Sequence, residues 1–161
     1  MRALPTDRDL SVIVYSDGAA RSNPGPAGIG ALVTTQDGRV LAELGEGIGP
    51  ATNNVAEYKA AIAGLELAAE KGATRVLLRA DSRLLIEQLA GRFKVKNPTL
   101  QRLHQEARAL IKSFEKVTLE HVRREKNKEA DRLANEGVDS WLAENGPYEA
   151  PLPANPELFE D

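Results

Sequence analysis

Four acidic residues occupy positions from which carboxylates can act together in chemistry: Asp17, Glu57, Asp81 and Asp131. The first and third directly follow short, β-branched, apolar runs, whereas the other two fall in the first turns of segments with helical periodicity. In a mixed α/β sheet, functional groups gather where strands end and helices begin. The sequence contains no cysteine, and carboxylates without cysteine or histidine ligands suit hard cations such as Mg²⁺ or Mn²⁺.

A cluster of four carboxylates also indicates a particular reaction. The acids would repel one another strongly unless cations neutralised them, and two cations about 4 Å apart can hold the attacking and leaving oxygens of a phosphodiester. Each acid has a simpler interpretation too. An Asp after a strand is often a turn residue, and an acid in a first helical turn suits the helix dipole. Spacing alone leaves open whether the four converge.

The elements that must position these acids follow from hydrophobic periodicity. The pattern predicts a mixed five-stranded sheet flanked by helices, in the order βββαβααβα, with three antiparallel strands followed by parallel ones. The expected strands span residues 10–16, 29–35, 39–47, 75–80 and 117–122, with a turn-rich loop over 18–27. The expected helices span residues 52–72, 82–89, 98–114 and 127–138. Asn54 with Glu57 resembles a capping box, and Ser82 and Asn127 are expected caps.

The 161 residues are enough for one domain with a real core. We expect a polar arm over 1–9, a single catalytic domain over 10–140 and an acidic, proline-rich tail over 141–161. The net charge is −3, but residues 140–161 contain five acids and no lysine or arginine, so the rest of the chain has 21 basic and 19 acidic residues. Local patches must therefore decide any binding to nucleic acid. The sequence has no long apolar run and no signal-peptide pattern, which favours a cytoplasmic protein, expected to be a monomer, that does not bind membranes. It names no partner for the tail.

The residues around the acids resemble type 1 ribonucleases H in four places, in the order of that family. The matching segments are Tyr15–Gly30, Thr52–Glu57, Asp81-Ser82 and Asn127–Ala134. The resemblance covers roughly residues 10–139, and it is to a compact prokaryotic ribonuclease HI. It implies an endonuclease that hydrolyses the RNA strand of RNA–DNA hybrids with two Mg²⁺ or Mn²⁺ ions, giving 5′-phosphate and 3′-hydroxyl ends.

The resemblance also implies a role for each acid. Asp17 would bridge both metals, Glu57 and Asp81 would bind one each or share, and Asp131 would complete the second site. Glu57 would also contact an RNA 2′-hydroxyl, the group that distinguishes RNA from DNA. Substrate contacts are implied for six neighbouring residues: Gly18, Ser22, Asn23, Thr52, Asn53 and Asn54. The asparagines would face the minor groove and Thr52 a DNA phosphate, although turn and cap chemistry is the simpler interpretation of the asparagines.

The sequence departs from some relatives in the interval 90–98, which is too short for their basic helical protrusion. Arg92, Lys94 and Lys96 still form a small basic patch around Phe93, suited to a DNA backbone. A solvated loop with Phe93 in the core is an equal alternative. Arg83 stands where some relatives have a substrate-contacting glutamine, and it is a further candidate contact.

A second departure is a missing histidine. Many relatives carry a histidine in the loop before the last acid, but the two histidines here, His104 and His121, lie elsewhere. Arg124 is the expected replacement, with Arg123 as second choice. An arginine can hold a phosphate oxygen but cannot titrate near neutral pH.

Three other functions remain open at this stage. They are a module that binds hybrids without cutting, another nuclease or strand transferase of the same broad fold, and a purely structural domain. The presence of all four acids argues against the first. The Asn-Pro-Gly loop and the Thr-Asn-Asn start of the first helix argue against the second.

Overall fold

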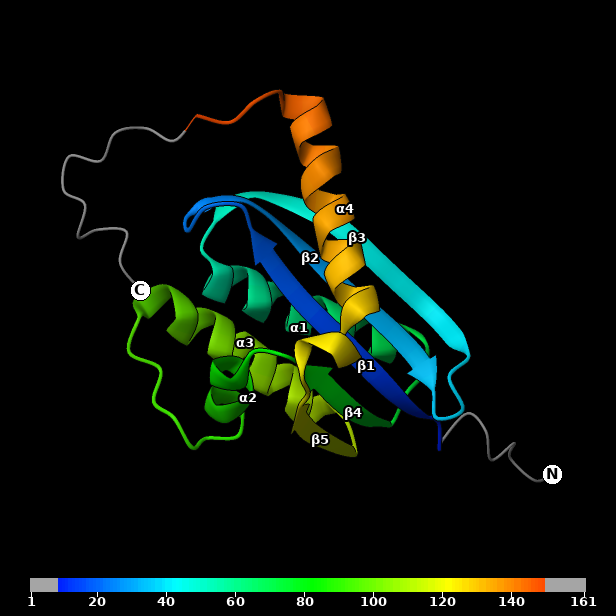
Figure 1. The fold of residues 1–161 in the computed structure, drawn as a ribbon. Coiled ribbons are helices and arrows are strands. Elements are labelled where there is room, and N and C mark those ends of the chain that lie inside the picture. The colour runs from blue at the N-terminus through cyan, green and yellow to red at the C-terminus, as the bar shows by residue number, and fades with distance from the viewer. Residues whose placement is uncertain (1–8, 150–161) are drawn as a thin grey trace.

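A mixed five-stranded sheet forms the centre of the protein in the computed structural model, which describes residues 9–149 (Figure 1). Its strands are β1 (Ser11–Ala20), β2 (Gly25–Thr35), β3 (Val40–Ala51), β4 (Arg75–Ala80) and β5 (Lys116–His121). They lie in the order β3-β2-β1-β4-β5. The pairs β1–β2 and β2–β3 are antiparallel, and β1–β4 and β4–β5 are parallel. The predicted fold class is therefore confirmed.

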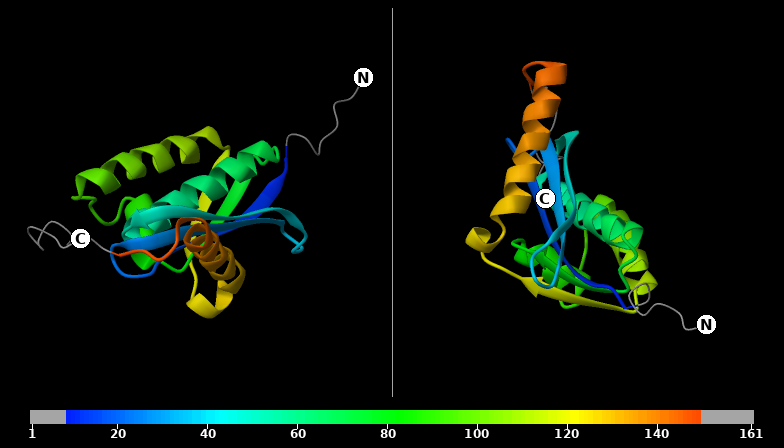
Figure 2. Two further views of the ribbon diagram at one scale, coloured as in Figure 1. Left: turned by 90° about the horizontal axis from the view of Figure 1, so that it is seen from above. Right: turned by 90° about the vertical axis from the view of Figure 1, so that its right-hand side faces the viewer.

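The helices cover the two faces of the sheet unequally. They are α1 (Asn53–Glu70), α2 (Arg83–Leu89), α3 (Pro98–Ser113) and α4 (Lys128–Asn145), with a short 3-10 turn η2 (Arg124–Lys126) before the last. Figure 2 shows α1 and α3 on one face and α4 alone on the other. None of the helices in residues 9–149 has the length and apolar character needed to span a membrane.

The main core lies between the sheet and α1. Alternate residues of β1, Val12 and Val14, are buried there with Leu65 of α1 and Leu78 of β4. This period-two burial is what a strand covered on one face requires. On the other face, α4 lies directly against the backbone of β2, because a side chain at Gly28 or Gly30 would collide with backbone atoms of α4. Glycine therefore sets the close approach of this helix.

The ends of several elements differ from the sequence prediction. The expected loop over 18–27 is mostly strand, because β1 and β2 continue pairing past Gly18 and Ile29, and only residues 21–24 turn. Helix α4 continues to Asn145 instead of stopping at residue 138, with Trp141 packed over Gly47 of β3. The expected tail boundary at residue 140 thus falls inside α4. Residues 1–8 of the expected arm and 150–161 of the expected tail lie outside the described residues.

One expected cap is wrong, and a second, Asn127, stands at the cap position of α4 without a side-chain capping bond. Thr52, not Asn54, caps α1, since its Oγ1 accepts from the Val55 N–H at 3.2 Å. Asn127 makes no side-chain cap bond at the start of α4. The Ser82 cap is confirmed by its bond from the Leu85 N–H. Glu57 and Asn127 are therefore not engaged in capping, and both side chains point toward the site described next.

Candidate active site

Three of the four acids meet at one edge of the sheet. Asp17, Glu57 and Asp81 each offer a carboxylate oxygen, and these oxygens lie within 4.8 Å of one another. The pairing of Ser16 with Ala80 between parallel β1 and β4 places the residues that follow them, Asp17 and Asp81, side by side. Glu57 reaches them from the first turns of α1.

Gly18 explains how α1 comes so close. A side chain at this position would collide with the backbone of Ala56 and Glu57, so glycine lets the helix start lie against β1. The Gly18 N–H donates to Oε1 of Glu57, which fixes that carboxylate beside Asp17. Gly18 therefore contributes to the site by allowing the start of α1 to pack closely against β1.

Asp131 approaches the other three acids from the opposite face of the sheet. It lies in the first turn of α4 and lines the same cleft, of about 400 Å³, as Asp17, Glu57 and Asp81. Burial is the main cause of a raised pKa of Asp17, and the nearby side chain of Asp131 adds a smaller contribution. Asp131 stands outside the group of three oxygens, at its rim.

The cluster is electrostatically costly. Asp17 is 6% exposed and Glu57 8% exposed. Burial raises the pKa of Asp17, and the charges of Glu57 and Asp81 raise it further. Burial also raises the pKa of Glu57, to about 7, although the Gly18 N–H opposes the shift. A divalent cation would relieve this repulsion, and an all-oxygen donor set is what Mg²⁺ and Mn²⁺ prefer, so the residues fit such ions.

Two asparagines tie the β1–β2 turn to the start of α1. The Asn53 N–H donates to Oδ1 of Asn23, and the Ala20 N–H donates to Oδ1 of Asn53, both at 3.0 Å. The Oδ1 atoms of Asn23 and Asn53 therefore both accept hydrogen bonds from the local backbone, as the interpretation of these asparagines as turn and cap residues predicts. Asn53 and Asn54 also line the cleft, whereas Asn23 supports Asn53 from beside it.

Two more of the expected substrate contacts, Ser22 and Thr52, lie in this region. Ser22 adopts a φ of 84°, in the left-handed region, at the tip of the β1–β2 turn. Thr52 uses its hydroxyl to cap α1, so any phosphate contact must share that group.

Comparison with known proteins identifies the family. A family model described as "Reverse transcriptase-like" matches residues 15–137. Ribonuclease HI of Halobacterium salinarum is 47% identical over 133 residues, covering 83% of this chain and 67% of that protein. The chain belongs to the type 1 ribonuclease H family.

Two further proteins are similar to this chain, one in sequence and one in structure. The bifunctional protein Rv2228c of Mycobacterium tuberculosis is 49% identical over 132 residues, but the match covers 81% of this chain and only 36% of that protein. The crystal structure of LC11-RNase H1 in complex with an RNA/DNA hybrid superposes with a TM-score of 0.78 at 41% identity, covering 81% of this chain and 99% of that one.

Arg124 is the arginine that lines the cleft. It lies in η2, and its charge opposes the rise that burial causes in the pKa of Glu57. Arg123 precedes η2 and is not among the residues that line the cleft. Of the two candidates, geometry favours Arg124.

The expected basic patch lies away from the cleft. Lys94 and Lys96 are exposed on the segment between α2 and α3, and Arg92 is held by both oxygens of Glu87. Phe93 is 45% exposed, so the alternative that placed it in the core is wrong. Arg83 begins α2 and is likewise absent from the cleft lining.

Asn127 is a residue that sequence reasoning misassigned. It is 1% exposed, and its Nδ2 donates to the Ser16 carbonyl at 2.9 Å and lies 3.5 Å from Oδ2 of Asp81. Its Oδ1 is buried without a partner among the described residues. This amide joins the start of α4 to the middle of β1. The sequence signal, a cap-type residue before a helix, could not distinguish this role.

Proposed function

We propose that this ribonuclease H is an endonuclease that hydrolyses the RNA strand of RNA–DNA hybrids, leaving 5′-phosphate and 3′-hydroxyl ends. The observation that carries the proposal is the convergence of three carboxylate oxygens within 4.8 Å, with Asp131 lining the same cleft. The structure of a relative with an RNA/DNA hybrid bound supports the choice of substrate.

Two divalent cations, Mg²⁺ or Mn²⁺, are the proposed cofactors. Asp17 would hold both, Glu57 and Asp81 would complete one site, and Asp131 the other. Bound cations supply positive charge to phosphodiester oxygens and lower the pKa of water. The four side chains come from β1, from α1, from the connection between β4 and α2, and from α4, so the packing of these parts positions them.

Residues beside the acids would select and orient the substrate. The carbonyl oxygens of Asn23 and Asn53 are used within the protein, so their amide N–H groups are the ends available to a minor groove. Asn54, Gly18 and Ser22 would complete this surface, and Thr52 would support a DNA phosphate. Glu57 would contact a 2′-hydroxyl, which explains a preference for RNA.

Exchanging Arg124 for alanine is expected to lower turnover about 10-fold or more while changing the Kd for the hybrid by less than about 3-fold. The guanidinium would act on charge that develops at the phosphate more than on the bound ground state. Single-turnover kinetics and a binding titration in Ca²⁺ measure the two effects separately. Arg123→Ala is the matched control, and equal turnover in both variants would remove Arg124 from the site.

The basic patch should make binding sensitive to salt. Replacing Lys94 and Lys96 together with alanine is expected to weaken hybrid binding and to reduce the slope of log Kd against log salt by about 1 to 2. Lys112→Ala, in the last turn of α3, is the control that keeps the slope of the parent protein. An unchanged slope in the double variant would show that neither lysine contacts a phosphate.

A substrate panel tests the proposed function against its alternatives. The protein is incubated with a labelled RNA–DNA hybrid, duplex DNA, duplex RNA and a four-way junction, each with Mg²⁺, Mn²⁺ or a chelator. We expect metal-dependent cutting of the RNA strand in the hybrid. Binding without cutting would favour a binding module, and cutting of junctions or duplex DNA would favour another nuclease of the same fold.

A further inference from the structure

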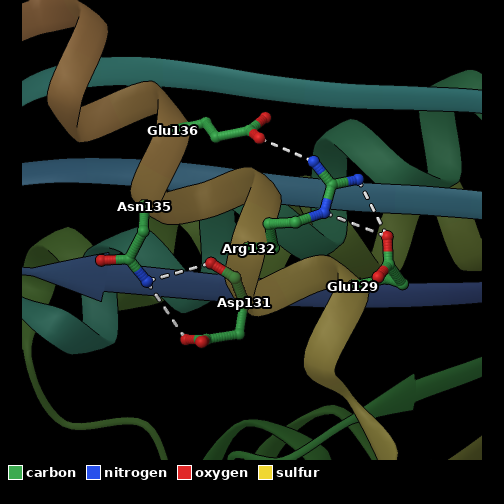
Figure 3. Close-up of polar contacts among 5 residues, drawn as sticks. All are labelled: Glu129, Asp131, Arg132, Asn135 and Glu136. Atoms are coloured by element: carbon green, nitrogen blue, oxygen red, sulfur yellow. Dashed lines mark hydrogen bonds and ion pairs between the residues drawn. The ribbon is translucent and has the colours of Figure 1, made fainter.

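Helix α4 presents three polar side chains one turn apart, on the side that faces the β1–β2 turn: Asp131, Asn135 and Asp139. Nδ2 of Asn135 donates to the Asp131 carbonyl at 3.0 Å and to Oδ1 of the same residue at 3.3 Å (Figure 3). The amide therefore contacts both the backbone and the carboxylate of the acid at the rim of the cleft.

Arg21, in the β1–β2 turn, contacts the other two of these side chains, Asn135 and Asp139. Its Nη1 pairs with Oδ1 of Asp139 at 2.7 Å, and its Nη2 approaches Oδ1 of Asn135 at 3.4 Å. A guanidinium has donors only, so the asparagine must present its oxygen to Arg21 and its NH₂ group to Asp131. Arg21 thus fixes the orientation of the Asn135 amide group.

The neighbouring ion pairs of α4 do not share this arrangement. Arg132 binds Glu129 and Glu136 on another side of the helix from Asn135, as Figure 3 shows. Both partners are about half exposed, with side-chain exposures of 59% and 57%. Such exposed pairs contribute little to stability and do not touch Asp131.

We propose that Asn135 is a positioning residue for Asp131, oriented by Arg21, and that it sets the affinity of the second cation site. The inference rests on the proposed function, because it assigns Asp131 to that site. A neutral donor holds one carboxylate oxygen in place without cancelling its charge, and leaves the other oxygen for a cation. A cationic side chain in the same place would compete with the metal for the carboxylate.

The test compares Asn135→Ala with Glu136→Ala in the full chain. Mn²⁺ binding is followed by electron paramagnetic resonance without substrate, and hybrid cleavage is measured over a range of Mg²⁺ concentrations. For Asn135→Ala we expect Mn²⁺ binding to weaken by about 3- to 10-fold, as for the loss of one hydrogen bond of ordinary net strength. The Mg²⁺ concentration for half-maximal kcat should rise similarly, while KM for the hybrid changes by less than about 2-fold.

Two further variants separate positioning from a general loss of structure. Asn135→Gln keeps an amide donor and should recover part of the affinity, and Arg21→Leu should weaken Mn²⁺ binding less than Asn135→Ala does. Glu136→Ala should match the parent protein. If Asn135→Ala binds Mn²⁺ as tightly as Glu136→Ala does, the inference is wrong even if the parent cuts hybrids. If the parent binds Mn²⁺ but cuts no hybrid, the proposed function fails and the Mn²⁺ comparison still decides the role of Asn135.

Discussion

Replacing Asp17 with asparagine is expected to reduce cleavage of a hybrid by at least about 1000-fold. Asp17 is a buried acid whose carboxylate has an oxygen within 4.8 Å of an oxygen of Glu57 and of Asp81. Asparagine keeps the shape of the side chain but removes the charge that cations require. Single-turnover cleavage with excess protein measures the effect, and retention of more than a tenth of the parent rate would remove Asp17 from the reaction.

The same substitution should make the metal-free protein more stable. The pKa of Asp17 is raised in the folded state from an ordinary value of 3.8, so above about pH 4 the folded protein binds more protons than the unfolded chain. Stability without metal therefore falls as the pH rises, and Asp17→Asn removes this loss, by about 2 kcal/mol at pH 8. Urea unfolding in a chelator at pH 5 and pH 8 measures the difference.

Asp37→Asn is a control for which we expect a change in stability of the opposite sign. The Thr35 hydroxyl lowers the pKa of this exposed carboxyl, so its ionised form favours the folded state above its ordinary pKa. Loss of this carboxylate in Asp37→Asn should lower the stability of the folded protein slightly at pH 8 and leave cleavage of the hybrid unchanged. If Asp17→Asn and Asp37→Asn shifted stability in the same direction, the account of charge crowding at Asp17 would be wrong.

Gly30→Ala is expected to have the largest effect on folding, at least about 3 kcal/mol of lost stability. The added methyl would meet the Ala130 carbonyl oxygen and lie 2.6 Å from the Ala134 nitrogen, and both are backbone atoms that cannot rotate away. Relief requires α4 to move off β2, which also moves Asp131 away from Asp17. Urea unfolding and hybrid cleavage should therefore decline together.

Gly38→Ala provides the matched comparison for this overpacking. Nothing lies within 4 Å of a methyl at Gly38, so only its φ of 92° penalises alanine, by about 1 kcal/mol. Cleavage should be unaffected because the β2–β3 turn lies outside the cleft lining. Equal losses in the two variants would show that α4 does not depend on direct contact with β2.

The sequence predicted the order of elements because burial on one face imposes a period that the residues display. The strand ends were not predictable in the same way. Pairing of Gly18 with Ile29 and of Ala20 with Ala27 depends on the partner strand, and local turn residues gave the opposite signal. The end of α4 was missed for a similar reason, since Trp141 packs over Gly47, which is distant in sequence.

The candidate site was predictable in its acids but not in its supporting contacts. The spacing from Asn54 to Glu57 fits a capping box, yet Thr52 caps the helix and Glu57 turns toward Gly18. The sequence likewise predicts only a cap at Asn127, because it does not show that Ser16 lies beside this side chain and accepts its hydrogen bond. The same residue types serve caps and sites, so only the packing of β1, α1 and α4 decides between them.

The most direct test of the central claim is the fate of the two strands of one hybrid. With the RNA and DNA strands labelled separately, Mg²⁺ should produce RNA fragments with 5′-phosphate and 3′-hydroxyl ends and leave the DNA strand whole. A chelator should abolish the cleavage. Cleavage that persists in the chelator, or RNA fragments with 2′,3′-cyclic phosphate ends, would contradict metal-dependent hydrolysis by Asp17, Glu57, Asp81 and Asp131.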